Sequence, residues 1–332
     1  MDINKRTLRN GALVILAAVV LRIILSCTIG DSVALFAQPQ LADYLIREKT
    51  EEVIGATEAN QTEPTTKATE PTTGEQHLPL TGIDITEADS AYVELKYSCS
   101  LRPDIPALLN EPIQWNLYGD EPSVLIIHTH GTEAFTPSEG MEYEENGGDY
   151  RTTNDKVNMI SIGDELTRLL QAAGINVIHD REYYDYPDYE ASYDICREAL
   201  QKHLQQNPTL KLVIDLHRDS ATYEDGTQWA TSCTVNGQQS AQVMIVMGTD
   251  RQYDHPNWEK NLSLGLKLHA LMEKTHPGAT RPLDLRKQRF NQDLSAGAII
   301  AEVGSAGNTH EEAMSGVSVL AEAVIALAEG AK

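Results

Sequence analysis

The sequence predicts an α/β domain with a largely parallel or mixed central sheet flanked by helices, and three observations support this fold class. From about residue 80 onward, short apolar runs alternate with longer segments whose apolar residues recur at helical spacing. The short runs are nearly continuous in apolar residues, as expected for strands that are covered on both faces. Two of them lead directly into histidines, and the carboxyl ends of such strands are where functional groups collect.

Three segments precede this domain. Residues 1–10 contain three basic side chains and are followed by an apolar run, 11–29, that is interrupted only by Arg22 and a few small polar residues. Its length suits one membrane crossing or the core of a signal peptide, and the basic residues predict that the N-terminus stays in the cytoplasm. We expect a single-pass anchor in the cell membrane with an extracytoplasmic domain. Residues 24–27 also allow a lipidation signal, so cleavage or lipidation of the anchor stays open.

Residues 30–80 form the expected extracytoplasmic linker. A Thr-Glu-Pro-Thr-Thr unit at 62–66 recurs at 69–73, within a stretch rich in Thr, Glu and Pro at 57–79. Such a composition buries too little apolar surface to offset chain entropy. We therefore expect a disordered tether, with the folded domain at 81–332.

Within the domain, strand and helix patterns follow one another in order. The helical pattern that begins at Asn158 ends where Gly174 offers a C-cap. The other expected helices are shown by apolar residues on one side, and the strands by short apolar runs. We expect strands at 124–128, 175–179, 210–217, 241–248 and 298–303, and helices at 158–173, 193–205, 258–274 and 311–329.

The bulk composition excludes some classes of function. The hydrophobic fraction of 41% suffices for a real core, and the formal charge of −23 disfavours non-specific binding to nucleic acid or to an anionic surface. We expect no nucleic-acid partner. The four cysteines are too widely spaced for a Cys-x-x-Cys zinc or redox motif, and neither disulfide pairing nor the oligomeric state follows from the sequence.

The ends of two expected strands carry the residues of a candidate metal site. His128 and His130 lie two apart after the first strand, with Glu133 close behind, and His217 follows a second strand. Three ligands of the His/His/carboxylate type leave a catalytic zinc one open position for water. A lone histidine at a strand end is more often structural, but two such clusters with acids nearby favour a metal. Asp155 competes with Glu133 as the carboxylate ligand.

A third strand contributes a candidate general base. Glu302 lies in an otherwise apolar strand, where a carboxylate is costly unless it is paired or turned into a cleft. Hydrolysis needs a group that takes the proton of water and then gives it to the leaving amine. The structural alternative is an ion pair with Arg218 or Arg286. Arg218 is itself a candidate for binding a substrate carboxylate or an oxyanion, or else for a salt bridge with Asp219 or Asp215.

Other hydrolytic motifs are missing from the sequence. There is no Gly-x-Ser-x-Gly elbow, no His-Glu-x-x-His helix and no phosphate loop. A tyrosine-rich run at 183–193 is either a binding wall for sugar or peptide, or a loop fixed by aromatic packing. Of these two interpretations we prefer the second.

These segments together resemble the stage II sporulation protein P family. The resemblance is carried by His-Thr-His-Gly-Thr-Glu-Ala-Phe at 128–135, Ile-Asp-Leu-His-Arg-Asp-Ser at 214–220 and Ala-Glu-Val-Gly at 301–304, and it covers roughly 85–330. It implies a membrane-anchored peptidoglycan hydrolase that acts in engulfment during sporulation. It also implies two partners from the same engulfment complex, a lytic transglycosylase and a polytopic membrane protein.

The pattern is more distantly similar to zinc N-acetylmuramoyl-L-alanine amidases, which implies an amidase-like fold and Zn²⁺ as cofactor. In that resemblance His130 and His217 match ligands, and Glu302 matches the catalytic glutamate. The glutamate ligand of those enzymes opens a helix, a position that falls near Asp155 here. The third ligand therefore stays open between Glu133 and Asp155, with Glu133 preferred and His128 as a further candidate.

Two functions follow as expectations. The first is a zinc-dependent hydrolase that cuts the amide between muramic acid and the stem peptide, with cleavage of peptide cross-links also implied by the resemblance. The second is a non-catalytic extracytoplasmic protein that binds the cell wall, with structural histidines. The coexistence of His130, His217 and Glu302 favours the enzyme.

Overall fold

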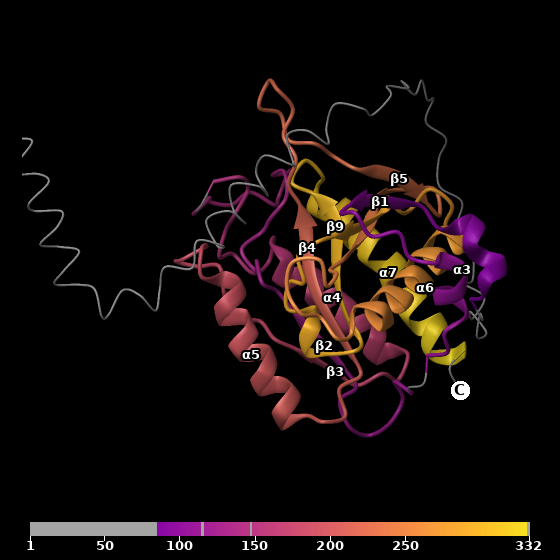
Figure 1. Cartoon of the computed structure of the whole chain (residues 1–332). Coiled ribbons are helices and arrows are strands. Elements are labelled where there is room, and N and C mark those ends of the chain that lie inside the picture. Colours follow the sequence, from indigo (N-terminus) through magenta and orange to yellow (C-terminus); the bar gives the residue numbers. More distant parts are fainter. Residues whose placement is uncertain (1–84, 114–115, 147, 331–332) are drawn as a thin grey trace, which may run out of the picture. The chain divides into compact units, whose positions relative to one another are not determined.

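A seven-stranded sheet organises the part of the chain that the computed structural model describes, residues 85–113, 116–146 and 148–330 (Figure 1). The expected tail, anchor and linker, and the first four residues of the expected domain, lie outside these residues. In chain order the elements are η2 (Glu87–Tyr92), β1 (Leu95–Ser98), α3 (Ile105–Asn110), β2 (Val124–Ile127), α4 (Met159–Ala172), β3 (Val177–His179), α5 (Ser192–Gln206), β4 (Leu212–Asp219), β5 (Ser232–Val235), β6 (Gln238–Ala241), β7 (Val243–Met247), α6 (Trp258–Thr275), β8 (Leu283–Arg286), η3 (Gln292–Leu294), β9 (Ala298–Ser305) and α7 (His310–Gly330).

The sheet is mixed, and the strand order is β1-β8-β7-β9-β4-β2-β3. Strands β3, β2, β4 and β9 are parallel to one another, whereas β7 runs antiparallel to β9 and is itself parallel to β8. The carboxyl ends of β2, β4 and β9 therefore lie at one edge of the sheet. This confirms the expected fold class and places the two histidine segments and Glu302 at a common edge.

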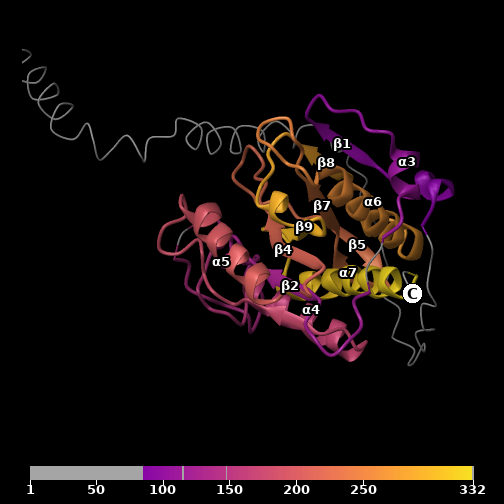
Figure 2. The same cartoon turned by 60° about the horizontal axis from the view of Figure 1, so that its bottom comes forward.

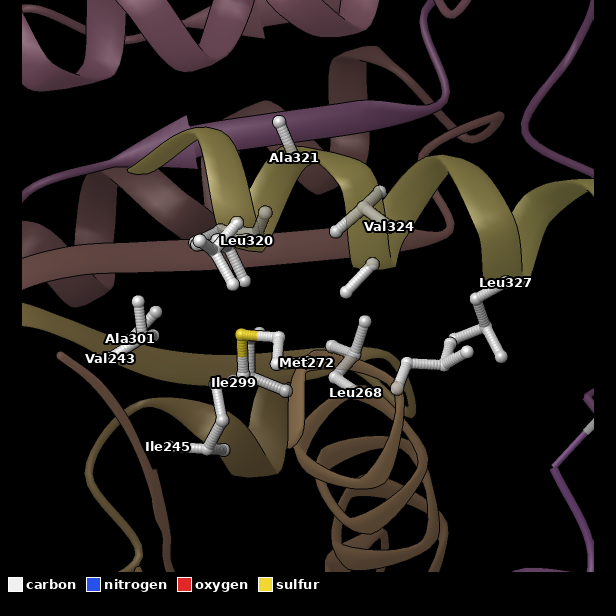
Figure 3. Close-up of a cluster of buried hydrophobic side chains, with 14 of the residues drawn as sticks. Val243, Ile245, Leu268, Met272, Ile299, Ala301, Leu320, Ala321, Val324 and Leu327 are labelled. Atoms are coloured by element: carbon white, nitrogen blue, oxygen red, sulfur yellow. The ribbon is translucent and has the colours of Figure 1, made fainter. Parts of the chain in front are cut away.

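Helices cover both faces of the sheet (Figure 2). The apolar faces of α4, α6 and α7 pack into one large core with alternate residues of the strands, while α5 packs on the other face against β2 and β4. Figure 3 shows the first core, where Leu320 and Val324 of α7 meet Leu268 of α6 and Ile299 of β9. Fully burying one such side chain contributes about 1.5–3 kcal/mol, so this layer contributes strongly to the stability of the fold.

Helix α7 also illustrates how composition can mislead. Among the residues that the structure describes, it is the one helix long and apolar enough to cross a membrane. Its most apolar window is 61% buried within the fold, where it packs against α4 and α6. The apolar composition of α7 is therefore explained by its place in the core.

The expected strands and helices are confirmed, and their bounds differ by a few residues. Helix α4 begins after Asn158, whose side chain accepts a hydrogen bond from the amide of Ile160 at 3.0 Å, and Gly174 follows it with a φ of +83°. Seven short elements were not expected: η2, β1, α3, β8, η3 and the two strands of the β5–β6 hairpin. The hairpin turns at Asn236 and Gly237, which both have positive φ, the combination typical of a tight hairpin turn.

Candidate active site

His217 and Glu302 form the centre of the candidate site. They are paired in register on the neighbouring parallel strands β4 and β9. Side chains at paired positions leave the same face of a sheet next to each other. This is the face that carries α5, because Val213, four residues before His217, packs in the α5 core. Both residues lie within their strands, as the expected bounds 210–217 and 298–303 already had them, and β4 and β9 each continue two residues beyond those bounds.

His130 reaches the same place from the loop after β2. Its ring centroid lies 5.2 Å from that of His217, and the two planes are nearly perpendicular. Tyr189 stacks on the His130 ring, with 4.6 Å between centroids. Both ring nitrogens of His130 are buried and have no hydrogen-bond partner among the described residues. A buried imidazole in this condition fits a ligand that comes from outside the chain.

Glu133 completes the group from the same loop. Its Oε2 lies 3.4 Å from Nδ1 of His217 and accepts the backbone N–H of Arg218 at 3.2 Å. Its Oε1 accepts a hydrogen bond from Arg151 at 3.3 Å. Burial opposes the charged form, but the hydrogen bond with His217 and the charges of Arg218 and Arg151 hold the pKa of Glu133 well below its usual range.

The other nitrogen of His217 is also occupied. Its Nε2 lies 2.8 Å from Oδ1 of Asp215. Although burial disfavours the charged imidazole, Asp215 and Glu133 raise the pKa of His217 well above its usual value. The site therefore concentrates negative charge around a buried histidine.

The pKa of Glu302 is shifted in the opposite direction to that of Glu133. The residue is partly exposed, yet its Oε2 is buried without a hydrogen-bond partner. Burial raises the pKa of Glu302 to about 8, with Asp219 and Glu133 adding to the rise and His217 opposing it. A carboxyl group that holds its proton near neutral pH is suited to acid–base work.

His128 does not join this group. Its Nε2 lies 2.8 Å from Nε2 of His179, and its Nδ1 lies 2.9 Å from the carbonyl oxygen of Leu216. It is fully buried beneath Gly163 of α4, on the face of the sheet opposite to α5. Because β2 ends at Ile127, the alternation of a strand no longer applies to His128 and His130.

Asp155, the carboxylate that competed with Glu133, also lies away from the two histidines of the site. Asp155 is half exposed and lies 2.9 Å from Nη2 of Arg181. Glu133, in contrast, is buried and faces His217. Of the two carboxylates that the sequence left open, the structure brings Glu133 to the histidines.

Arg218 is wholly buried, and its donors point into the protein. Its Nε donates to the carbonyl oxygen of Ala134 at 2.8 Å, and Nη2 donates to the carbonyl oxygens of Asp149 and Tyr150. These contacts attach the long loop between β2 and α4 to the end of β4. They give Arg218 a role in holding the loop that carries Glu133.

The tyrosine-rich run is divided between two roles. Tyr183 and Tyr184 donate their hydroxyls to the carbonyl oxygen of Thr153 and to Asp180, so both are fixed in the fold. Tyr189 stacks on His130, while Tyr186 is 47% exposed. Packing thus explains most of this run.

Some residues of the site carried no usable sequence signal. Arg151 bridges Glu133 and Asp185, with 3.3 Å to each, and its guanidinium lies over the Tyr189 ring. It stands in a loop without periodicity, so only the fold reveals its position. Asp215 was recognised only as a possible partner of Arg218.

The donor set fits zinc in its chemistry. Two imidazoles and one carboxylate, from His130, His217 and Glu133, are the ligand types that zinc takes in catalytic sites. Within the described residues, no group of three or more His, Cys, Asp or Glu has the geometry of a formed metal site. The buried nitrogens of His130 without partners support the fit, because they gain a partner only when something binds.

Comparison with known proteins gives one family. The family model described as stage II sporulation protein P matches residues 33–325. A stage II sporulation protein P from Bacillus subtilis (strain 168) is 30% identical over 205 residues, which cover 58% of this chain and 48% of that protein. The match therefore spans about half the length of this relative.

Solved structures with a similar arrangement of elements include three amidases. The CwlD amidase from Clostridioides difficile, in complex with the GerS lipoprotein, is 10% identical, with a TM-score of 0.37 over 61% of this chain and 96% of that chain. An N-acetylmuramyl-L-alanine amidase from Mycobacterium smegmatis is 10% identical, with a TM-score of 0.39 over 64% of this chain and 99% of that chain. The catalytic domain of an N-acetylmuramoyl-L-alanine amidase from Paenibacillus polymyxa var. colistinus is 10% identical, with a TM-score of 0.35 over 61% of this chain and 96% of that chain. Likenesses this distant say nothing about the chemistry of the site.

Proposed function

The chain belongs to the stage II sporulation protein P family, and from this premise we propose that it is a zinc-dependent peptidoglycan hydrolase of sporulation. The observation that carries the proposal is the register pair of His217 and Glu302 on β4 and β9, with His130 and Glu133 delivered beside it by the loop after β2. This arrangement combines candidate metal ligands with a carboxyl group whose pKa lies near 8.

The ligands in this proposal are His130, His217 and Glu133. Zinc, when bound, supplies a Lewis acid that lowers the pKa of water and polarises a carbonyl oxygen. Buried carboxylates around His217 favour a cation at this place, because negative charge in a dry site is costly when it is uncompensated. Tyr189 and Arg151 keep His130 and Glu133 in position, since one stacks on the ring and the other binds the carboxylate.

Glu302 is the proposed general base and acid. It takes a proton from the attacking water and gives it to the leaving amine nitrogen. A pKa of about 8 lets the carboxyl group hold and release a proton near neutral pH, and its burial raises this pKa. Its partial exposure lets a substrate amide approach it.

The substrate class rests on the family. We propose that the bond cleaved is the amide between muramic acid and the stem peptide, with cross-link cleavage as a second activity, during engulfment. We also propose that the apolar run at 11–29 anchors the domain outside the cytoplasm in a single pass. A lytic transglycosylase and a polytopic membrane protein are the proposed partners.

The test is digestion of purified peptidoglycan by the full chain in detergent, with bound metal measured in the same preparation. Glu302→Gln keeps the shape of the side chain but removes its basicity, so amide cleavage should fall by about 10²–10⁴-fold with zinc content unchanged. Glu165, a partly exposed residue paired with Arg168 on α4, supplies the matched control: Glu165→Gln should cleave at the wild-type rate.

Mass spectrometry of the released fragments separates amidase from endopeptidase products. Undiminished cleavage by Glu302→Gln would show that another group acts as the base. If the zinc-loaded wild type binds cell wall but releases no fragments, the protein is a wall-binding module.

A further inference from the structure

A buried carboxylate with no part in the proposed reaction lies behind His217. Asp215 stands two residues before His217 on β4, so both side chains leave the same face of the strand. The Asp215 carboxylate is almost completely buried, and its Oδ1 lies 2.8 Å from Nε2 of His217. The two side chains are therefore in direct hydrogen-bond contact.

Thr129 fixes this carboxylate from the loop after β2. Its backbone N–H donates to Oδ1 of Asp215 at 2.8 Å, and its hydroxyl donates to Oδ2 at 2.6 Å. Both oxygens of Asp215 are thus held by one residue. Thr129 stands directly before His130, so the same contact joins the segment carrying one candidate ligand to the strand carrying the other.

The contact with Asp215 decides which nitrogen of His217 can face a metal ion. A neutral imidazole has one N–H and one lone pair, and an ionised carboxylate only accepts hydrogen bonds. Both nitrogens of His217 face ionised carboxylates, Nε2 that of Asp215 and Nδ1 that of Glu133. Thr129 already binds both oxygens of Asp215, so Nε2 keeps its proton, whereas a cation bound by Glu133 would take the place of the proton on Nδ1.

We propose that Asp215, held by Thr129, is a positioning residue that makes His217 present Nδ1 to a zinc ion. The inference rests on the proposed function, because it takes His130, Glu133 and His217 as the ligands. Carboxylates that orient a ligating histidine in this way fix its tautomer and raise its basicity, and their loss typically costs 10–100-fold in metal affinity. If Asp215 were only a structural partner of His217, its loss would lower stability without a selective effect on zinc.

The test measures the zinc affinity of the metal-free full chain in detergent by competition with a chromophoric chelator. Asp215→Leu removes the acceptor and should weaken zinc binding by about 10–100-fold. Asp215→Asn keeps an acceptor oxygen for Nε2–H and should recover most of that loss. Thr129→Val removes one of the two hydrogen bonds that hold Asp215 and should weaken binding by about fivefold.

A matched control lies on the other face of the sheet. Glu322 of α7 meets Nε2 of His276 at 2.7 Å, a carboxylate–imidazole contact of the same kind between α6 and α7. Glu322→Gln should bind zinc as the wild type does. Thermal unfolding of each metal-free variant reports whether the variant is folded.

The outcomes separate the inference from the proposed function. A folded Asp215→Leu protein with wild-type zinc affinity would overturn the inference alone. If Asp215→Leu does not fold, wild-type affinity in Thr129→Val would overturn it equally. A wild-type protein that binds no zinc would overturn both this inference and the zinc dependence of the proposed function.

Discussion

Glu133 shows how single residues set the charge balance of the site. It meets His217, Arg151 and the backbone of Arg218 at once, which keeps it ionised despite full burial. Glu302, one strand away, lacks such partners and has a pKa of about 8. Two carboxyl groups in one site are thus held in different protonation states by their neighbours, which is the arrangement that assigns one to binding and the other to proton transfer.

A histidine outside the site makes stability depend on pH. His269 of α6 is fully buried, and its Nε2 accepts the amide N–H of Glu94 at 3.2 Å, so the ring is neutral in the folded protein. Burial lowers its pKa from 6.5 to about 4. The stability that neutral His269 contributes to the folded protein is fully present above pH 6.5 and is lost as the pH falls toward 4. Between pH 7 and pH 5 this group should lower the free energy of unfolding by about 2 kcal/mol.

Urea unfolding at both pH values measures the effect. His269→Gln keeps an acceptor for the Glu94 amide but takes up no proton, so its free energy of unfolding should fall less between pH 7 and pH 5 than that of the wild type. Equal losses in the two proteins would mean that His269 already titrates normally in the folded state.

At the scale of elements, the end of β9 is held by contacts with the loop after β2 and with the segment before β5. Gly304 has a φ of +70°, a conformation that glycine adopts at low cost, at the place where the register between β4 and β9 shifts. The chain then turns back to Asn308, whose side-chain oxygen accepts the amides of Ser305 and Thr231. The carbonyl oxygen of Asn308 accepts the amide of Thr136, in the loop after β2. The position of Glu302 therefore depends on contacts outside its own strand.

Helix α4 depends on a glycine for its approach to the sheet. A Cβ at Gly163 would lie 2.5 Å from Nε2 of His179 and 2.7 Å from Nε2 of His128. Gly163→Ala should therefore destabilise the protein by about 1–3 kcal/mol through overpacking, even though alanine favours a helix. Chemical denaturation compares it with Gln171→Ala, an exposed position on the same helix that should change stability by less than about 0.5 kcal/mol. Stability at or above wild type in Gly163→Ala would show that the histidine pair moves aside freely.

At the scale of the whole molecule, the site is assembled from segments far apart in the chain. The loop after β2 brings His130, β4 brings His217 and β9 brings Glu302, and only the order of strands in the sheet makes them neighbours. A ligand bound by both histidines would thus connect the loop after β2 to β4. Its binding free energy would add to the stability of the fold.

Zinc should therefore stabilise the whole domain. With free zinc at about 100 times its dissociation constant, the free energy of unfolding should rise by about 2.7 kcal/mol. Removal of the metal by a chelator should therefore lower the Tm of the wild type. His130→Ala lacks a proposed ligand and should show a much smaller shift under the same conditions. Identical unfolding curves with zinc and with chelator would contradict a zinc site in this protein.

The sequence by itself determined the features that depend on local pattern. Apolar periodicity predicted the strands that carry the site and the helices that cover them, because side-chain direction repeats every two residues in a strand and every 3.6 in a helix. Glu302 was singled out because a carboxylate in an apolar strand is costly without a partner, and His217 because functional groups collect at the carboxyl ends of such strands. The short elements β1, α3, β8 and the β5–β6 hairpin were not predicted, because segments of four to six residues are too short to show apolar periodicity.

Only the tertiary structure decided which of the candidates meet. His128 and His130 are two residues apart, yet they lie on opposite faces of the sheet because β2 ends between Ile127 and His128. The sequence preferred Glu133 to Asp155, but only the fold shows Glu133 beside His217 and Asp155 beside Arg181. The link from Thr129 through Asp215 to His217 also comes from the fold. These contacts join residues distant in the chain, and their distances are set by strand order, register and loop packing, none of which leaves a periodic trace in the sequence.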